Sequence, residues 1–317
     1  MSNLRPILVT GAHRSGTTWV GRMLALSPQL GYINEPFSPI CRPGICGIRF
    51  DKWFTCIGSD NGGDYEDALR RTLTFRYDLP AELKSLGYWE APPANYPPEE
   101  LKMLEDYSRF AMHSARGATP LMKDPISVFS AEWLADRFGM RVLVLIRHPG
   151  AFASSIRRLN WKMPFQNLLQ QPLLMDGYLK PWRAEIEAQA ASPGDIIDQA
   201  GLFWKCVYHT VRGYETAHPD WTFVRHEDIC ADPIKHYRWF YACFGLDWTP
   251  QIEAAILASS REENPAGWKD GDNPHALILN SRAVTKDWKK RLTREETLSL
   301  RRAVEEVSGY YYGDGDW

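Results

Sequence analysis

The sequence has no excess of either charge and no long hydrophobic run. Its 317 residues include 37 Lys and Arg and 39 Asp and Glu, a formal net charge of -2. General nucleic-acid binding needs a clustered basic surface, so this balance argues against a nucleic-acid partner. No apolar run approaches the roughly 20 residues of a membrane-spanning helix, and the first strand-like segment begins almost at the N-terminus. We therefore expect a cytoplasmic protein without membrane anchor or signal peptide.

The spacing of cysteines typical of a metal site is also missing. Cys41, Cys46 and Cys56 lie close together around a Pro-Gly turn, but no C-x-x-C pair or nearby histidine completes such a site. We expect reduced, mostly packed thiols, while a disulfide from Cys41 to Cys46 or Cys56 stays open as the alternative. With 44% hydrophobic residues, the chain is long enough to bury a large core.

What the sequence does contain is a strand, loop and helix pattern from residue 7 to residue 35. Ile7–Val9 reads as a short buried strand, residues 11–16 as a glycine-bearing loop, and the helical pattern runs from Thr17 until Pro28 closes it. This arrangement aims unpaired backbone N–H groups at an anion. The alternative is an ordinary turn whose glycines serve only the chain reversal.

The loop lacks the lysine of magnesium-dependent nucleotide loops. Gly11 and Gly16 have the spacing of the G-x-x-x-x-G-K-[ST] motif, but Thr17 stands at the lysine position and the cation has moved into the loop as Arg14. An arginine fork with backbone amides suits a phosphate or sulfate held without a metal.

The loop residues carry a family resemblance. The run Arg14, Ser15, Gly16, Thr17, Thr18 and Trp19 resembles the 5′-phosphosulfate loop of sulfotransferases that use 3′-phosphoadenosine-5′-phosphosulfate (PAPS). The following Asn34-Glu35-Pro36 resembles the acidic position of Golgi carbohydrate and tyrosylprotein sulfotransferases. This resemblance implies that Glu35 is the base that deprotonates the acceptor hydroxyl. Because proline restricts the residue before it, we expect an extended backbone at Glu35.

A second part of the resemblance lies at Lys123-Asp124-Pro125. In isolation Lys123 and Asp124 would be an unremarkable surface pair at the end of a short strand. In tyrosylprotein sulfotransferases a similar lysine touches the sulfuryl group, which implies this role for Lys123. Cytosolic sulfotransferases place a catalytic histidine where this chain has Pro125, which favours Glu35 as the base.

The third part follows the clearest buried strand, residues 141–146. Arg147 stands at its carboxyl end, where open α/β sheets bind ligands, and Pro149 begins a helix that carries Ser155. The spacing of Arg147 and Ser155 resembles the family's 3′-phosphate pair. A structural ion pair at Arg147 is the alternative.

Further residues are expected at the nucleotide. Ser281 and Arg282 resemble a loop of bacterial sulfotransferases that closes over the nucleotide, and Lys289 belongs to a similar Trp-Lys block or to a solvated face. Trp19 stacks on the adenine or packs in the core. The Arg-His-Glu-Asp run from Arg225 resembles a family block that we interpret as structural.

The remaining segments are assigned by pattern. Residues 37–120 read as an acceptor-side insertion of short helices and loops or as a packing lid, and residues 159–191 as a second acceptor wall. We expect helices at 130–138 and 200–218, a strand at 221–225, and a capping box from Thr293 to Glu296.

Together these patterns predict one domain, residues 1–317, with a three-layer α/β fold of the nucleoside-kinase-like sulfotransferase type and a central parallel sheet. The resemblance implies sulfuryl transfer from PAPS to an acceptor hydroxyl, without a metal. It favours a carbohydrate, glycolipid or natural-product alcohol as acceptor. A P-loop kinase or NTPase and a catalytically inactive nucleotide-binding module are the alternatives.

Overall fold

A five-stranded parallel sheet lies at the centre of the molecule. The computed structural model describes residues 4–85, 99–265, 278 and 280–317. The strand order is β2-β3-β1-β4-β5, and every pair is parallel. The strands are β1 (Ile7–Gly11), β2 (Leu30–Asn34), β3 (Thr119–Lys123), β4 (Arg141–Ile146) and β5 (Thr222–Arg225).

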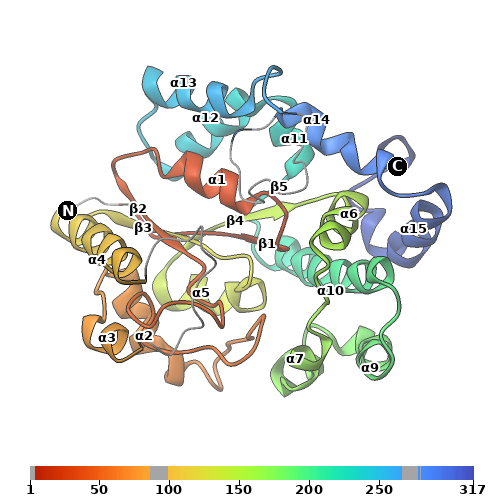
Figure 1. Cartoon of the computed structure of the whole chain (residues 1–317), viewed down its shortest axis with the longest axis horizontal. Helices are drawn as coiled ribbons and strands as arrows, with labels where there is room; N and C mark the ends of the chain where they lie inside the picture. Colours follow the sequence, from red (N-terminus) through yellow and green to blue (C-terminus); the bar gives the residue numbers. More distant parts are fainter. Residues whose placement is uncertain (1–3, 86–98, 266–277, 279) are drawn as a thin grey trace.

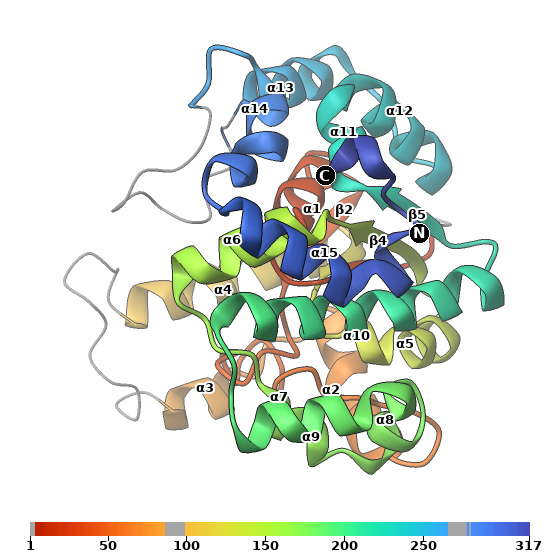
Figure 2. The same cartoon turned by 90° about the vertical axis from the view of Figure 1, so that its right-hand side faces the viewer.

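Helices cover both faces of the sheet (Figures 1 and 2). Side chains alternate across each strand, so Leu8 packs into one hydrophobic core while Ile7 and Val9 pack into the other. The first core lies between the sheet and α5 (Ala131–Phe138), α6 (Pro149–Leu159), α10 (Ile196–Ala217) and α15 (Arg294–Ser308). The second lies under α1 (Thr17–Leu24), α12 (Pro233–Phe244) and α13 (Pro250–Ser260). These layers confirm the predicted three-layer α/β fold.

The parallel register places the ends of several strands at one edge. Lys123 at the end of β3 is level with Val9 on one side and Asn34 on the other. Because β1 has β3 on one side and β4 on the other, the chain crosses over in both directions from it, and ligands bind at such a switch point. The segments following β1, β2, β3, β4 and β5 therefore emerge beside one another.

The insertion at 37–120 is helical where it is described. It contains α2 (Gly63–Leu73), α3 (Leu79–Ser85) and α4 (Glu99–Ala115), and α4 is longer than the short helices expected. The proline-rich stretch at 91–98 lies outside the described residues.

Helix boundaries follow local capping chemistry. Thr293 and Glu296 form the predicted capping box, and Asp195 starts α10 by accepting hydrogen bonds from the N–H groups of Ile197 and Asp198. Helix α1 ends at Leu24, earlier than expected, because Ser27 N–H bonds the Leu24 carbonyl in a tighter turn. The other helices are α7 (Phe165–Leu169), α8 (Pro172–Asp176), α9 (Arg183–Ala191), α11 (His226–Ala231) and α14 (Ser281–Lys286), with 3₁₀ turns at Val128–Ser130, Lys180–Trp182, Asp287–Lys290 and Asp314–Asp316.

All six cysteines are free thiols, as expected, so the alternative disulfide from Cys41 is wrong.

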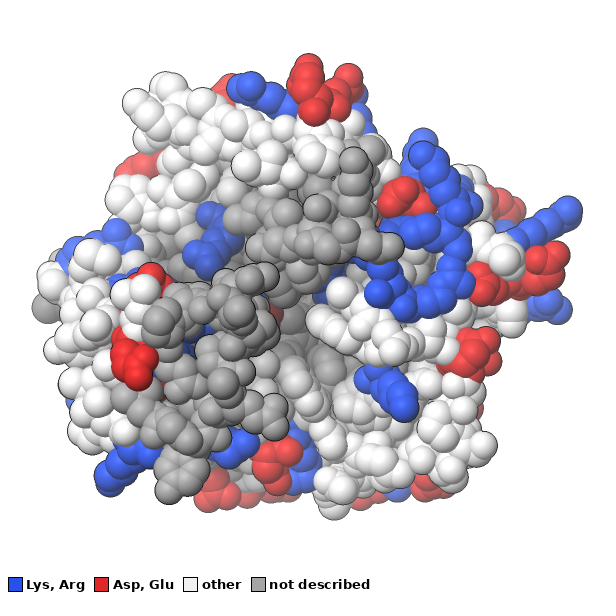
Figure 3. Space-filling model, in the orientation of Figure 1, with Lys and Arg blue, Asp and Glu red and all other residues white. Residues whose placement is uncertain are grey.

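None of the described helices has the length and apolar character needed to cross a membrane. On the face in Figure 3, basic and acidic side chains are interspersed.

Gly11 allows the chain to turn at the end of β1. Its φ is +136°, and a Cβ there would lie 2.3 Å from the Leu145 carbonyl oxygen of the adjacent strand. We expect Gly11→Ala to lower the free energy of unfolding by about 2–4 kcal/mol, since both the backbone strain and the clash must be relieved. The matched control is Gly213→Ala in α10, where a Cβ meets nothing within 4 Å and the change should stabilise by about 0.5–1 kcal/mol. Urea unfolding measures the free energy of unfolding of both variants. Equal changes in the two variants would contradict a conformational requirement for glycine at position 11.

Candidate active site

The loop after β1 leads directly into an uncapped helix start. Gly16, with φ +93°, is the N-cap residue of α1, and no side chain caps the first turn. A Cβ at Gly16 would lie 2.3 Å from Cδ2 of His226, so this position leaves no room for a larger residue. The first N–H groups of α1 and the helix dipole favour an anion here.

Two arginines from different strand ends meet at this loop. Arg14 has φ +66° and donates from Nε to Ser155 Oγ at 3.2 Å, while Arg147 donates to the Arg14 carbonyl. Arg147 Nε is buried and has no hydrogen-bond partner among the described residues. Arg14, Arg147 and Ser155, far apart in sequence, are thus brought together as expected.

The positive charge here is concentrated and partly desolvated. Burial, followed by repulsion from Arg147 and Arg158, lowers the pKa of Arg14 to about 9, against an opposing effect of Glu35. Arg291 also faces this cavity, and burial lowers its pKa. An anion bound among these guanidinium groups would relieve both the repulsion and the lack of solvent.

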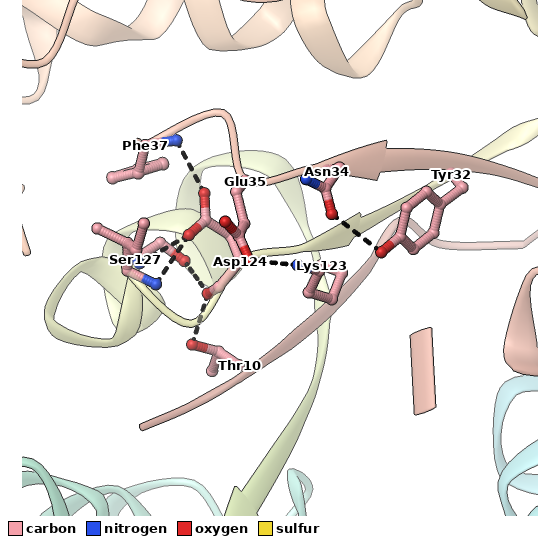
Figure 4. Close-up of polar contacts among 9 residues, drawn as sticks. Thr10, Tyr32, Asn34, Glu35, Phe37, Lys123, Asp124 and Ser127 are labelled. Atoms are coloured by element: carbon pink, nitrogen blue, oxygen red, sulfur yellow. Dashed lines mark hydrogen bonds and ion pairs between the residues drawn. The ribbon is translucent and has the colours of Figure 1, made fainter. Parts of the chain in front are cut away.

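Glu35 and Lys123 form an ion pair at the neighbouring strand ends (Figure 4). The Lys123 side chain is 2% exposed, whereas that of Glu35 is 31% exposed and lines the same cavity as Arg14. The pair thus places an accessible carboxylate beside a buried ammonium group. A carboxylate in this position can accept a proton from a bound molecule.

The expected extended backbone at Glu35 is wrong. Its φ is +47°, in the left-handed region, because the chain turns immediately after β2. Glu35 N–H bonds the Lys123 carbonyl at 2.9 Å, and its own carbonyl accepts from Ser38 N–H at 3.1 Å. These bonds override the preference that Pro36 imposes, and such strained residues cluster at functional sites.

Asp124 is a buried organiser of this turn, not a surface residue. Its carboxylate accepts hydrogen bonds from Phe37 N–H at 2.8 Å, Ile126 N–H at 2.8 Å and Ser127 N–H at 3.1 Å (Figure 4). Burial, and then Glu35, raises the pKa of Asp124 to about 7, while these N–H groups oppose the shift. Both residues are buried, so the alternative of an unremarkable surface pair of Lys123 and Asp124 is excluded.

Of the other expected nucleotide residues, most lie at the cavity. Thr17 and Thr18 line it, and Ser15 is buried behind them, with an Oγ that bonds no other described residue. Ser281 also lines it and donates to the Cys230 carbonyl at 3.0 Å. Trp19 lines it while donating to Ser259 Oγ at 3.0 Å.

Two expected residues point elsewhere. Arg282 is exposed and pairs with Glu262 at 2.9 Å, and the cavity lining does not include it. Lys289 donates to the carbonyl of Trp317 at 2.7 Å. The structure therefore brings Ser281 to the site but not Arg282 or Lys289.

The cavity itself has a volume of about 690 Å³. Sequence reasoning missed Arg158, Arg291 and His226, which line it together with the expected residues. Arg158 follows Ser155 by three positions on α6, so helical spacing could have indicated it. His226, which reaches the loop from α11, belongs to the Arg-His-Glu-Asp run that we interpret as structural, so the sequence pattern did not mark it as a lining residue.

The chain can be compared with a family model and with solved structures. A family model described as the sulfotransferase family matches residues 6–250. No curated protein sequence matches the chain. Solved structures similar to this chain include a sulfotransferase domain of an olefin synthase from Synechococcus PCC 7002, with 17% identity, 99% of this chain and 97% of that chain covered, and a TM-score of 0.48.

A mouse sulfotransferase complexed with PAP is also similar, with 14% identity, 99% of this chain and 87% of that chain covered, and a TM-score of 0.45. A sulfotransferase from Mycobacterium avium shows 15% identity over 98% of this chain and 78% of that chain, with a TM-score of 0.45. Because the family model matches most of its length, this chain belongs to the sulfotransferase family.

Proposed function

We propose that this chain transfers a sulfuryl group from PAPS to an acceptor hydroxyl and releases adenosine 3′,5′-bisphosphate (PAP). The observation that carries the proposal is that Arg14, Arg147, Ser155 and the partly exposed carboxylate of Glu35 line one cavity at the start of α1. Arg14 and the start of α1 would form a first anion site, Arg147 and Ser155 a second, and Glu35 would be the proton acceptor. We further propose that residues 1–317 form one catalytic domain, and the cytoplasmic location stays a prediction.

The two anion sites fit the two ends of the donor. The N–H groups of α1, with Arg14, Thr17 and Thr18, would hold the 5′-phosphosulfate. Arg147, whose buried Nε is unpaired in the described part of the chain, and Ser155 would hold the 3′-phosphate. Trp19 would border the adenine, and Ser281 would close the nucleotide side of the cavity.

In the proposed reaction, a few side chains would assist bond formation and proton transfer. The acceptor oxygen forms a bond to sulfur, the bond from sulfur to the phosphate oxygen of PAPS breaks, and Glu35 takes the hydroxyl proton. Lys123 and Arg14 would stabilise the negative charge on the transferred group and on the leaving oxygen. Lys123 is almost fully buried and is not among the lining residues of the cavity, so it would act from behind Glu35, through the ion pair of the two side chains.

The first prediction concerns the 3′-phosphate. PAP should bind far more tightly than AMP, because AMP lacks the group that Arg147 and Ser155 would contact. Arg147→Ala should reduce this preference by about 2–4 kcal/mol, the scale of a buried charged contact. Arg302→Ala, an exposed arginine of α15, is the control and should leave it unchanged. Calorimetric titrations measure both; equal affinities for PAP and AMP in the unmodified protein would exclude a 3′-phosphate site.

The second prediction concerns Glu35. Glu35→Gln keeps the size and an oxygen facing Lys123 but removes the base. We expect kcat to fall by roughly 10²–10⁴ while PAP binds with unchanged affinity. The exposed Glu187→Gln in α9 is the control. Turnover within a few-fold of the unmodified enzyme would show that Glu35 is not the base, and loss of PAP binding would indicate a structural role.

The third prediction separates this reaction from that of a P-loop kinase or NTPase. Thr17 occupies the place of the lysine in the magnesium-dependent loop, so turnover should be unchanged in excess EDTA. A steady-state assay with and without EDTA measures this. Loss of turnover that magnesium restores would favour the kinase.

A further inference from the structure

We propose, on the basis of the sulfuryl transfer proposed above, that the acceptor is an alcohol or phenol on a flat apolar skeleton, and not a polyhydroxylated sugar. The inference rests on the side chains that line the cavity next to Glu35. Six of them, here called the acceptor wall, are apolar: Ile40, Trp53, Phe54, Ile126, Trp161 and Met163.

The cavity has two chemically different halves. Arg14, Arg147, Arg158 and Arg291 lie on the side of the β1 loop, α6 and the segment after α14. On the side of the acceptor wall, the polar and charged groups among the described lining residues are Glu35, Ser38, Asn160 and Lys162. These groups could pair with some hydroxyl groups of a sugar, but hydroxyl groups that face the six apolar side chains would lose their hydrogen bonds to water, and each unmade hydrogen bond is costly.

His13 extends the wall from within the β1 loop. Its ring lies among aromatic rings, with centroids 5.5 Å from Phe54, 5.9 Å from Trp161 and 5.3 Å from Phe203. Burial, together with the neighbouring Arg14, lowers the pKa of His13 to about 3, so the imidazole is neutral. The residue therefore offers no charge to a bound acceptor, and its ring could form a single hydrogen bond there through Nδ1, which has no partner among the described residues.

The wall is held in place before any acceptor binds. Phe54 has φ +60°, a strained conformation for a bulky residue. Trp53 N–H bonds Asn167 Oδ1 at 2.9 Å, and Gln171 Nε2 bonds the Phe54 carbonyl at 3.2 Å. Strain maintained by such anchors is typical of binding sites, because a fixed wall loses little entropy when a ligand binds.

The rim of the wall also exposes large apolar surface. The side chains of Trp53 and Trp161 are 37% and 40% exposed, although both line the cavity. Figure 3 shows a hollow near the centre of the face, bordered in part by uncharged side chains. A flat apolar molecule would cover these rings, which gains free energy in proportion to the area removed from water.

The test uses the enzyme saturated with PAP, titrated with 2-naphthol and separately with methyl β-D-glucopyranoside. We expect 2-naphthol to bind at least roughly tenfold more tightly, the gain from covering one aromatic side chain. Trp161→Ala should weaken 2-naphthol binding roughly 10- to 100-fold without changing the affinity for PAP. The control is Trp239→Ala in α12, since this tryptophan is 44% exposed but lies away from the cavity lining. Trp161→Phe, which keeps a flat ring, should remain within a few-fold.

The outcomes separate the two proposals. If PAP does not bind, the proposed function fails. If PAP binds but the glucoside binds as tightly as 2-naphthol, or Trp161→Ala leaves 2-naphthol binding unchanged, the apolar acceptor is wrong while the donor site stands. Transfer of radiolabelled sulfuryl groups to 2-naphthol, absent with the glucoside, would complete the support.

Discussion

Repulsion between half-buried arginines at one sheet edge is the constraint on which the site depends. Arg14 and Arg147 would separate in water, yet the β1 loop and the end of β4 hold them in contact. The parallel sheet and its two cores supply the rigidity that this requires, because packed interiors resist small displacements. The result is a cavity prepared for an anion before the anion arrives.

The same rigidity places the ion pair of Glu35 and Lys123. Asp124 accepts three backbone N–H groups and fixes the turns that follow β2 and β3. With these turns fixed, Glu35 can hold a left-handed backbone and keep its carboxylate accessible, while Lys123 stays buried. Asp124 is therefore a positioning residue, and its carboxylate need not touch any reacting atom.

The two halves of the cavity would bind different molecules, the donor and the acceptor. The arginines and the start of α1 provide charge, which would select for an anionic donor, whereas the acceptor wall would provide shape and apolar area for the proposed acceptor. The wall comes from the insertion at 37–120, the segment after β3 and the segment after α6, while the charged half comes mainly from the sheet edge. Specificity for the acceptor can thus vary without disturbing the donor site.

The sequence by itself determined the elements and the residues close to a strand end. Apolar runs, helical periodicity, Pro149 and the capping box at Thr293 are local signals, so the strands of the sheet, the helices α1, α5, α6, α10 and α15, and the positions of Arg14 and Arg147 could be predicted. Only the tertiary structure decided the backbone of Glu35, the burial of Asp124 and the directions of Arg158, Arg282 and Arg291. These depend on hydrogen bonds and charges from segments distant in sequence, which no local pattern encodes.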